Sequence, residues 1–236
     1  MNRRDTARLA GRVALGAWAA FALLAAVVVG HRGVPLWPDS GLLDWSVGHR
    51  PAVAQAMARG VTDTGTGIIP YALVVLCASA VGRDARRRLT LILLGTACLA
   101  AGQALRYGVM TLVHRPRPAG TDWATHASGW SFPSGHTTTA AMTAGLLVLA
   151  VSLRAPRGAH LLRVTIGCWA VAVGLSRVYL GVHWLTDVLG GWLFATGWLA
   201  VCLWAAARML PARVLPGTAA TTPDPAEDHA SQDPGR

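Results

Sequence analysis

The sequence contains no lysine and few charged residues of any kind. All 21 basic residues are arginine, only 11 residues are acidic, and charged residues make up 14% of the 236 positions, against 53% for hydrophobic residues. Such a composition excludes an ordinary soluble domain and is typical of a protein that crosses a membrane several times. The net charge of +10 does not indicate nucleic acid as a partner, because the arginines separate apolar segments and form no basic stripe on a soluble face.

Cysteine is also scarce, and its spacing excludes the usual cysteine-based sites. The four cysteines lie inside apolar runs, without a CxxC pair or a neighbouring histidine. We therefore expect them to be small packing residues and predict neither a disulfide framework nor a zinc site. The four residues are Cys77, Cys98, Cys168 and Cys202.

Long apolar runs dominate the rest of the chain. A transmembrane helix needs about 20 predominantly apolar residues, and six runs bounded by charge approach or exceed that length. They cover approximately residues 11–30, 67–81, 89–113, 137–153, 161–180 and 184–210. The sequence therefore predicts an all-α integral membrane bundle of six transmembrane helices, formed by residues 1–210.

Three other segments allow simpler expectations. The first run follows several arginines and so resembles a secretory signal, but its core exceeds the usual ~7–15 residues and lacks a clear small-x-small cleavage site, so we expect a retained helix. Residues 41–60 fit either a short helix at the membrane interface or a plain connection. Residues 211–236 are rich in Pro, Ala, Thr and Asp, and we expect a disordered tail there.

The distribution of arginine predicts the orientation in the membrane. Cytoplasmic segments retain an excess of arginine. When the N-terminus is placed inside, most arginines fall on the inner side, including the four within residues 83–88. We therefore expect both termini, and hence the tail, in the cytoplasm. The connections after the third and fifth helices then lie on the extracytoplasmic side of the cell membrane.

Three polar segments stand at the predicted outer ends of the last four helices. They read HRPRPAG (114–120), FPSGH (132–136) and SRVYLGVHWLTD (176–187). Ionisable groups at membrane depth are costly unless paired or functional, and arginine binds phosphate oxygens in bidentate fashion. Ser134 can cap the fourth helix, and Gly135 lets an anion approach the free N–H groups at the positive end of the helix dipole. These segments therefore indicate a phosphate site.

The histidines in these segments add chemistry to binding. His183 and Asp187 are four residues apart at the start of the sixth helix, so they share a face on which the carboxylate can hold one imidazole nitrogen and leave the other basic. Such an imidazole can attack phosphorus and form a phosphohistidine. His136, in the first turn of the fourth helix, can protonate the departing oxygen and later activate water.

Together these residues resemble the type 2 phosphatidic acid phosphatase superfamily, the lipid phosphate phosphatases related to vanadium haloperoxidases. Its signature is K-x6-R-P, then P-S-G-H, then S-R-x5-H-x3-D, and the chain carries the second motif at 133–136 and the third at 176–187. The resemblance implies that His183 is the nucleophile, Asp187 its orienting partner and His136 the acid. It also implies that no metal or other cofactor is needed. The phosphate-binding positions that it implies are Arg117, Ser134, Gly135 and Arg177.

The first motif is incomplete, because Met110 occupies the position of the family's lysine. Arg106 and His114 lie one turn before and after it on the same helix face. Helical side chains lean toward the N-terminus, which predicts that Arg106 points away from the outer site and His114 back toward the gap. Arg115 is a further candidate, although an ordinary headgroup anchor is an equally simple interpretation of it. The replacement stays open.

We predict a lipid phosphate phosphatase that works at the extracytoplasmic ends of helices three to six. It would hydrolyse a phosphomonoester or diphosphate on a membrane lipid, such as a polyprenyl diphosphate like undecaprenyl diphosphate, without metal and through a phosphohistidine. Two alternatives remain. A phosphotransferase would pass the phosphoryl group to an alcohol, and a non-catalytic phospholipid-binding or transport protein would keep the arginines without needing both histidines and the aspartate. The sequence does not disclose the lipid or the oligomeric state.

Overall fold

The computed structural model describes residues 2–155 and 158–209, and every regular element in these ranges is helical. The predicted tail at 211–236 lies outside them. The all-α prediction is confirmed. The α-helices are α1 (Arg3–Gly30), α2 (Trp37–Gly48), α3 (Ala52–Asp63), α4 (Ile68–Val81), α5 (Ala85–Val113), α6 (Gly135–Arg154), α7 (His160–Tyr179) and α8 (Leu185–Met209), and one 3-10 turn covers Gly120–Asp122.

Within the part of the chain that the structure describes, five helices are long and apolar enough to cross a membrane, namely α1, α5, α6, α7 and α8. A sixth candidate is the pair α3 and α4, which passes the same test jointly but is bent by 53° at a short break. The predicted second span is not a straight one, because α4 has only 14 residues, fewer than the about 20 that a straight span needs; α3 and α4 together form either a broken span or a re-entrant segment. The chain is a multi-span membrane protein.

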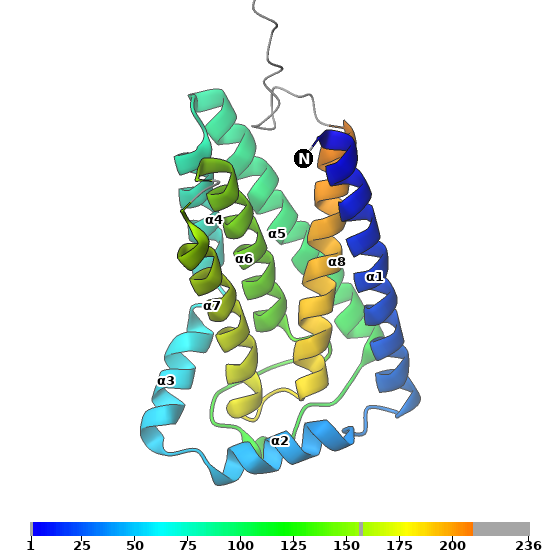
Figure 1. Cartoon of the computed structure of the whole chain (residues 1–236). Coiled ribbons are helices and arrows are strands. Elements are labelled where there is room, and N and C mark those ends of the chain that lie inside the picture. Colours follow the sequence, from blue (N-terminus) through cyan, green and yellow to red (C-terminus); the bar gives the residue numbers. More distant parts are fainter. Residues whose placement is uncertain (1, 156–157, 210–236) are drawn as a thin grey trace, which may run out of the picture.

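The helices pack through small residues, as expected where lipid removes the hydrophobic drive for helix association. α1 and α8 lie side by side along most of their length (Figure 1). A Cβ atom added at Gly197 of α8 would lie 2.9 Å from the Trp18 indole nitrogen, so only glycine admits that ring. The face of α1 that is buried there consists mainly of Ala7, Ala10, Ala14 and Ala17.

An aromatic cluster holds the start of α6 against α1 and α8. The Phe132 ring stacks on Phe21 of α1 with centroids 5.6 Å apart, and Phe21 meets Phe194 of α8 edge-on at 5.7 Å. Gly190 of α8 makes room for Phe132, since a Cβ there would lie 2.5 Å from the ring. The segment leading into α6 is thereby fixed beside the first turns of α8.

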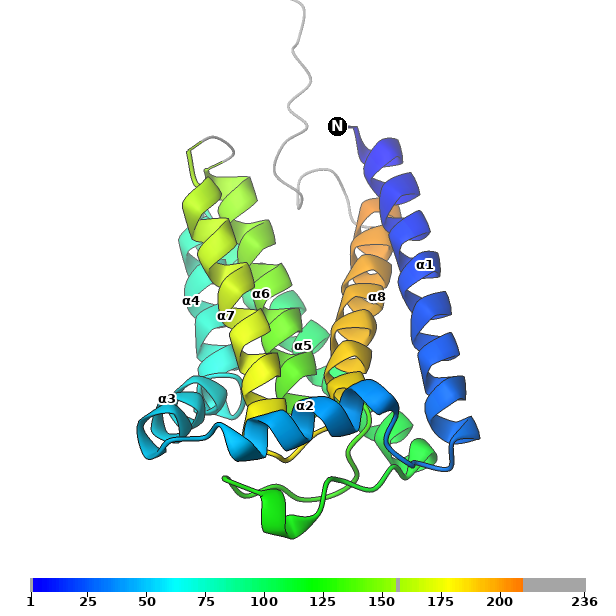
Figure 2. The ribbon, with the colours of Figure 1, turned by 60° about the horizontal axis from the view of Figure 1, so that its bottom comes forward.

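One end of the bundle is covered by α2 and α3. α2 lies across the end opposite the N-terminus, and the connection between α5 and α6 also runs over this end (Figures 1 and 2). Residues 41–60, for which a helix or a plain connection was expected, belong to two helices separated at residues 49–51. α2 turns Asp39, Leu43 and Ser46 toward the protein and leaves Trp37 87% exposed.

Candidate active site

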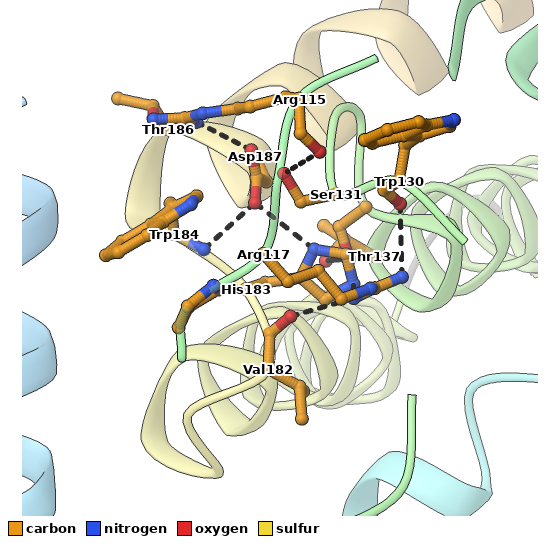
Figure 3. A network of polar contacts seen from close by, with 12 residues as sticks. Arg115, Arg117, Trp130, Ser131, Thr137, Val182, His183, Trp184, Thr186 and Asp187 are labelled. Atoms are coloured by element: carbon orange, nitrogen blue, oxygen red, sulfur yellow. Dashed lines mark hydrogen bonds and ion pairs between the residues drawn. The ribbon is translucent and has the colours of Figure 1, made fainter. Parts of the chain in front are cut away.

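The predicted site residues come together at the covered end of the bundle. His136 lies in the first turn of α6, Arg177 in the last turn of α7, and His183 in the short link before α8. A backbone hydrogen bond from Ser134 N–H to the Asp187 carbonyl, 3.1 Å long, ties the start of α6 to the start of α8. Residues distant in sequence therefore share one site (Figure 3).

His183 is buried between a carboxylate and a guanidinium. Its Nδ1 lies 3.3 Å from Asp187 Oδ2, and its Nε2 lies 2.8 Å from Arg117 Nη1. Arginine can only donate, so Nε2 accepts through its lone pair and Nδ1 carries the proton that is directed at Asp187. The backbone N–H of Trp184 also donates to Asp187 Oδ2, over 2.9 Å. This is the tautomer in which the outer nitrogen is the basic one.

The electrostatic surroundings keep His183 neutral. Its side chain is 2% exposed, and burial, followed by the positive charges of Arg117 and Arg177, holds the pKa of His183 well below its usual 6.5. An unprotonated imidazole keeps the lone pair that a nucleophile needs.

Arg117 uses all five of its N–H donors within the protein. Apart from His183, its acceptors are backbone carbonyls, so the guanidinium fixes the connection between α5 and α6 against the link before α8. Burial lowers the pKa of Arg117, Asp187 opposes that shift, and Arg106 adds to it. A phosphate could bind Arg117 only by displacing one of these contacts, and the contact with His183 is the one made to the basic Nε2. The carbonyl acceptors are those of Ser128, Gly129, Trp130 and Val182.

Arg177 has donors to spare. The residue is 2% exposed, its Nη1 donates to Thr62 Oγ1 of α3 over 3.1 Å, and its Nε is buried without a hydrogen-bond partner. An unpaired buried donor is costly, so an anion at this site would relieve that cost. α3 positions Arg177 through Thr62.

Ser134 does not cap α6 with its side chain, contrary to the expectation from the sequence. It occupies the N-cap position without a side-chain capping bond, and its Oγ accepts a 3.0 Å hydrogen bond from Thr137 Oγ1. The reason is that the Thr137 hydroxyl, one turn along the helix, holds the serine oxygen. The first N–H groups of α6, including that of Gly135, have no acceptor within the helix and suit an anion.

Arg115 is not a headgroup anchor, as one interpretation of the sequence had it. Its side chain is fully buried, with Nη1 2.6 Å from Asp187 Oδ1 and Nη2 2.7 Å from Asp39 Oδ2 of α2. Thr186 joins the group by donating to Asp39 from both its N–H and its hydroxyl. Arg115 therefore connects α2 to the carboxylate that orients His183. The sequence analysis assigned no role to Asp39, which stands in the WPDS segment at 37–40.

The predicted directions of Arg106 and His114 are both wrong. His114 is exposed and ends α5 in a left-handed conformation (φ 49°), and its ring packs edge-on against Trp130 at 4.8 Å. Arg106 instead reaches the start of α6, where a Cβ added at Gly135 would lie 3.4 Å from its guanidinium carbon. The left-handed turn swings His114 outward, and the long Arg106 side chain bends against the usual lean of a helical residue.

Comparison with known proteins identifies the family. The family model of the PAP2 superfamily matches residues 89–209. Phosphatidylglycerophosphatase B of Bacillus subtilis is 30% identical over 176 residues, which cover 72% of this chain and 83% of that protein. The chain belongs to the PAP2 superfamily. The resemblance drawn from the sequence motifs is confirmed.

The PAP2 match spans α5 to α8 and includes all the predicted site residues, whereas Asp39 and Thr62 lie before it. A solved PAP2 structure, a phosphatidylglycerolphosphate phosphatase from Bacillus subtilis, shares the fold with a TM-score of 0.67 and 25% identity, covering 83% of this chain and 94% of that one. Lipid A 1-phosphatase of Rhizobium etli is 37% identical over 81 residues, 34% of this chain and 31% of that protein.

Within residues 2–155 and 158–209, no group of three or more histidine, cysteine, aspartate or glutamate side chains is arranged to hold a metal ion. The four cysteines are free, and Cys98 and Cys202 bring their sulfurs within 3.6 Å between α5 and α8. The positive charge at the PAP2 site comes from arginine.

Proposed function

We propose that this PAP2 protein hydrolyses a phosphomonoester or diphosphate on a membrane lipid through a phosphohistidine at His183, without a metal. The observation that carries the proposal is the state of His183, which is buried and neutral with its basic Nε2 directed away from Asp187. A non-catalytic lipid-binding protein has no need for that tautomer, because its arginines alone would hold the phosphate.

The first step transfers the phosphoryl group to the enzyme. The phosphate binds between Arg177 and the N–H groups that open α6, and one of its oxygens replaces His183 as the partner of Arg117. His136 takes up a proton from solvent when the bound phosphate dianion offsets the neighbouring arginine charges. The Nε2 lone pair attacks phosphorus, the bond to the leaving oxygen breaks, and His136 gives that oxygen the proton. Asp187, hydrogen-bonded to Nδ1–H, stabilises the positive charge on the phosphorylated ring.

The second step returns the enzyme to its starting state. His136, now unprotonated, removes a proton from water, and the water oxygen attacks phosphorus as the P–N bond breaks. The products are the lipid alcohol, or the shortened lipid phosphate when the substrate is a diphosphate, and inorganic phosphate. Arginine and helix N–H groups supply the stabilisation of the pentacoordinate transition state, which supports metal independence.

The relatives favour a terminal phosphomonoester on a glycerophospholipid as the substrate. The curated Bacillus subtilis relative is named phosphatidylglycerophosphatase B, and the solved Bacillus subtilis structure is named a phosphatidylglycerolphosphate phosphatase. The placement of the site at one end of a membrane-spanning bundle suits a substrate that arrives laterally with its phosphate at headgroup depth. We further propose that residues 1–210 are the phosphatase domain, that both termini are cytoplasmic and that the site is extracytoplasmic, because arginine is concentrated at the other end of the helices.

A substrate panel tests the proposal. Purified protein with EDTA present should release phosphate from phosphatidylglycerol phosphate faster than from phosphatidate or undecaprenyl diphosphate. His183→Ala should abolish release, while His114→Ala, at an exposed histidine of the same end, should leave it unchanged. Undiminished release from His183→Ala would refute the mechanism. Strict dependence on an added metal would refute metal independence, and accumulation of a phosphorylated alcohol when one is added would favour the phosphotransferase.

A further inference from the structure

A site for a phosphate dianion needs cations whose hydrogen-bond donors are free to receive it. In this structure two of the arginines at the site are already committed, Arg115 to two aspartates and Arg117 to four carbonyls and His183. Arg177 has free capacity. Met110, at the position where the family signature has lysine, is apolar and only 7% exposed, so it contributes no charge.

We propose that Arg106 supplies the missing cation and binds the phosphoryl group together with Arg177 and the start of α6. The inference rests on the proposed function, and it names a phosphate-binding residue that the sequence motifs do not contain. It also reverses the expectation that Arg106 points away from the site.

The register of α5 against α6 places Arg106 at the right height. The Gln103 amide of α5 donates a hydrogen bond to the Thr139 hydroxyl of α6. The two helices are antiparallel, so three residues onward along α5, at Arg106, corresponds to three residues backward along α6, at His136. Arg106 therefore lies level with the first turn of α6, whereas Met110 lies one turn beyond it, where its methyl carbon approaches Gly129.

The guanidinium of Arg106 packs against the opening of α6. A Cβ added at Gly135 would lie 3.4 Å from both its Cζ and its Nη1. Glycine at this position thus lets the guanidinium lie close to the first turn of α6. Helix N-termini and arginine forks both favour phosphate oxygens, and here the two are adjacent.

Arg106 lacks a strong hydrogen-bond acceptor among the described residues. Its Nη1 contacts Met110 Sδ at 3.4 Å, and its Nε is buried without a partner. A thioether sulfur is a weak acceptor, and an unsatisfied buried donor raises the energy of the protein without ligand. The positive charge of Arg106 also lowers the pKa of Arg117 and of His183, after the larger effect of burial. An oxyanion among these groups would satisfy the donors and offset the repulsion.

Arg106 can take the place of the lysine that the family signature has at position 110, because side chains from both positions can reach the space near Gly135. A lysine at 110 would lean toward the N-terminus of α5, as helical side chains usually do, and its ammonium would approach the space near Gly135. Arg106, one turn earlier, bends toward the C-terminus and reaches the same space from the other side. A planar guanidinium then replaces a point charge and can bind two phosphate oxygens at once.

Orthovanadate is a suitable probe because it is a tetrahedral oxyanion like phosphate and needs no knowledge of the natural lipid. Its affinity can be measured by inhibition of phosphate release and by the rise in Tm that a bound ligand causes. Arg106→Gln should weaken vanadate binding about 10- to 100-fold, the loss expected for one hydrogen bond to a charged group. Arg86→Gln, which removes a charge from the exposed far end of α5, should change it less than about twofold.

The double variant Arg106→Gln, Met110→Lys distinguishes binding from packing. A lysine restored at 110 should return vanadate affinity to within about threefold of wild type, since the cation re-enters the site one turn away. Failure of this rescue would assign Arg106 a structural role and overturn the proposal, as would unchanged affinity in Arg106→Gln.

Two further results keep the proposal separate from the proposed function. If Arg106→Gln does not fold, Arg106→Met, which keeps an apolar stem but removes the charge, should weaken vanadate binding by a similar factor, and unchanged affinity would overturn the proposal. Phosphate release by wild type with unchanged vanadate affinity in Arg106→Gln would defeat only this inference. Absence of both phosphate release and vanadate binding in wild type would defeat the proposed function itself.

Discussion

At the scale of single residues, the site is a chain of groups that orient His183. Asp39 holds Arg115, Arg115 holds Asp187, and Asp187 accepts from His183 Nδ1. Three of these four groups form two buried ion pairs, and burying charges is costly unless each one is paired. The pairing therefore serves position as well as stability.

If His183 is the nucleophile, as proposed, its lowered pKa predicts where the acid limit of activity lies. Burial and the neighbouring arginines keep the ring unprotonated as pH falls through 6.5. The acid limb of kcat/KM, corrected for the ionisation of the substrate measured alone, should therefore begin below pH 6.5. A limb centred at or above 6.5 would contradict the assignment. Protein stability should fall below about pH 6.5, because there only the unfolded chain binds the proton.

Arg115 should matter more for stability than any surface arginine. Arg115→Met leaves Asp39 and Asp187 buried without their cation, and loss of one member of a buried ion pair costs about 3–5 kcal/mol of unfolding free energy. Arg86→Met, at an exposed position, should change it by less than about 0.5 kcal/mol. Denaturant unfolding in detergent measures both, and equal midpoints for the two variants would show that the network adds no stability.

Residue-level prediction succeeded where chemistry fixes the spacing and failed where tertiary contacts decide. The four-residue offset of His183 and Asp187 predicted that the two side chains meet, and they do. The predicted reason was wrong, because His183 lies in the link before α8 and only Asp187 lies on the helix. The partner of Arg115 could not be predicted, because Asp39 is 76 positions away and which face of α2 is buried depends on docking. The predicted direction of Arg106 was wrong because it relied on the general lean of helical side chains toward the N-terminus, whereas the Arg106 side chain contacts Met110 and the start of α6.

At the scale of elements, α2 lies over the site and is joined to it by hydrogen bonds to one buried aspartate, Asp39. Asp39 accepts hydrogen bonds from the α2 N-terminus at Leu36, from Thr186 and from Arg115. The same carboxylate therefore begins α2 and connects it to the first turn of α8. A disturbance of α2 is expected to reach Asp187 through Arg115.

Asp39→Asn tests this connection. The amide keeps the shape but loses the charge that Arg115 and the Thr186 N–H favour, so amide hydrogen exchange in α2 should speed up. kcat should fall about 10-fold or more, since small misplacements of a catalytic group can cost up to ~100-fold. Asp44→Asn, at an exposed position of the same helix, is the matched control. Equal exchange and kcat in the two variants would contradict the connection.

Element prediction was accurate for the long apolar runs and incomplete around the interface. All six runs correspond to helices, with α1 beginning earlier because Asn2 caps it through Asp5 N–H. The break between α3 and α4 was not predicted. At this break Gly65 packs on Val173 of α7, so closely that a Cβ at position 65 would lie 2.3 Å from a valine methyl. That contact depends on α7 and leaves no periodic signal in the sequence.

At the scale of the whole molecule, the site lies at the end of the bundle that α2 crosses, opposite the N-terminus (Figure 1). Most of the arginines within residues 2–155 and 158–209 lie near the helix termini at the other end. Because cytoplasmic segments retain arginine, the site should face outward. Gly120 is exposed in the connection that covers the site end, so a cysteine introduced there into a variant without native cysteines should react with a membrane-impermeant thiol reagent in intact cells. Protection until the cells are opened would reverse the orientation.

The central claim is that His183 carries the phosphoryl group between the two steps. Protein with His136→Ala should be mixed with an aryl phosphate labelled on phosphorus, whose good leaving group needs no acid, and quenched in base, which preserves phosphohistidine. We predict label on the peptide that contains His183 and none when His183→Ala is added. Label on a different residue, or phosphate release with no labelled enzyme at any time in the first turnover, would contradict the account.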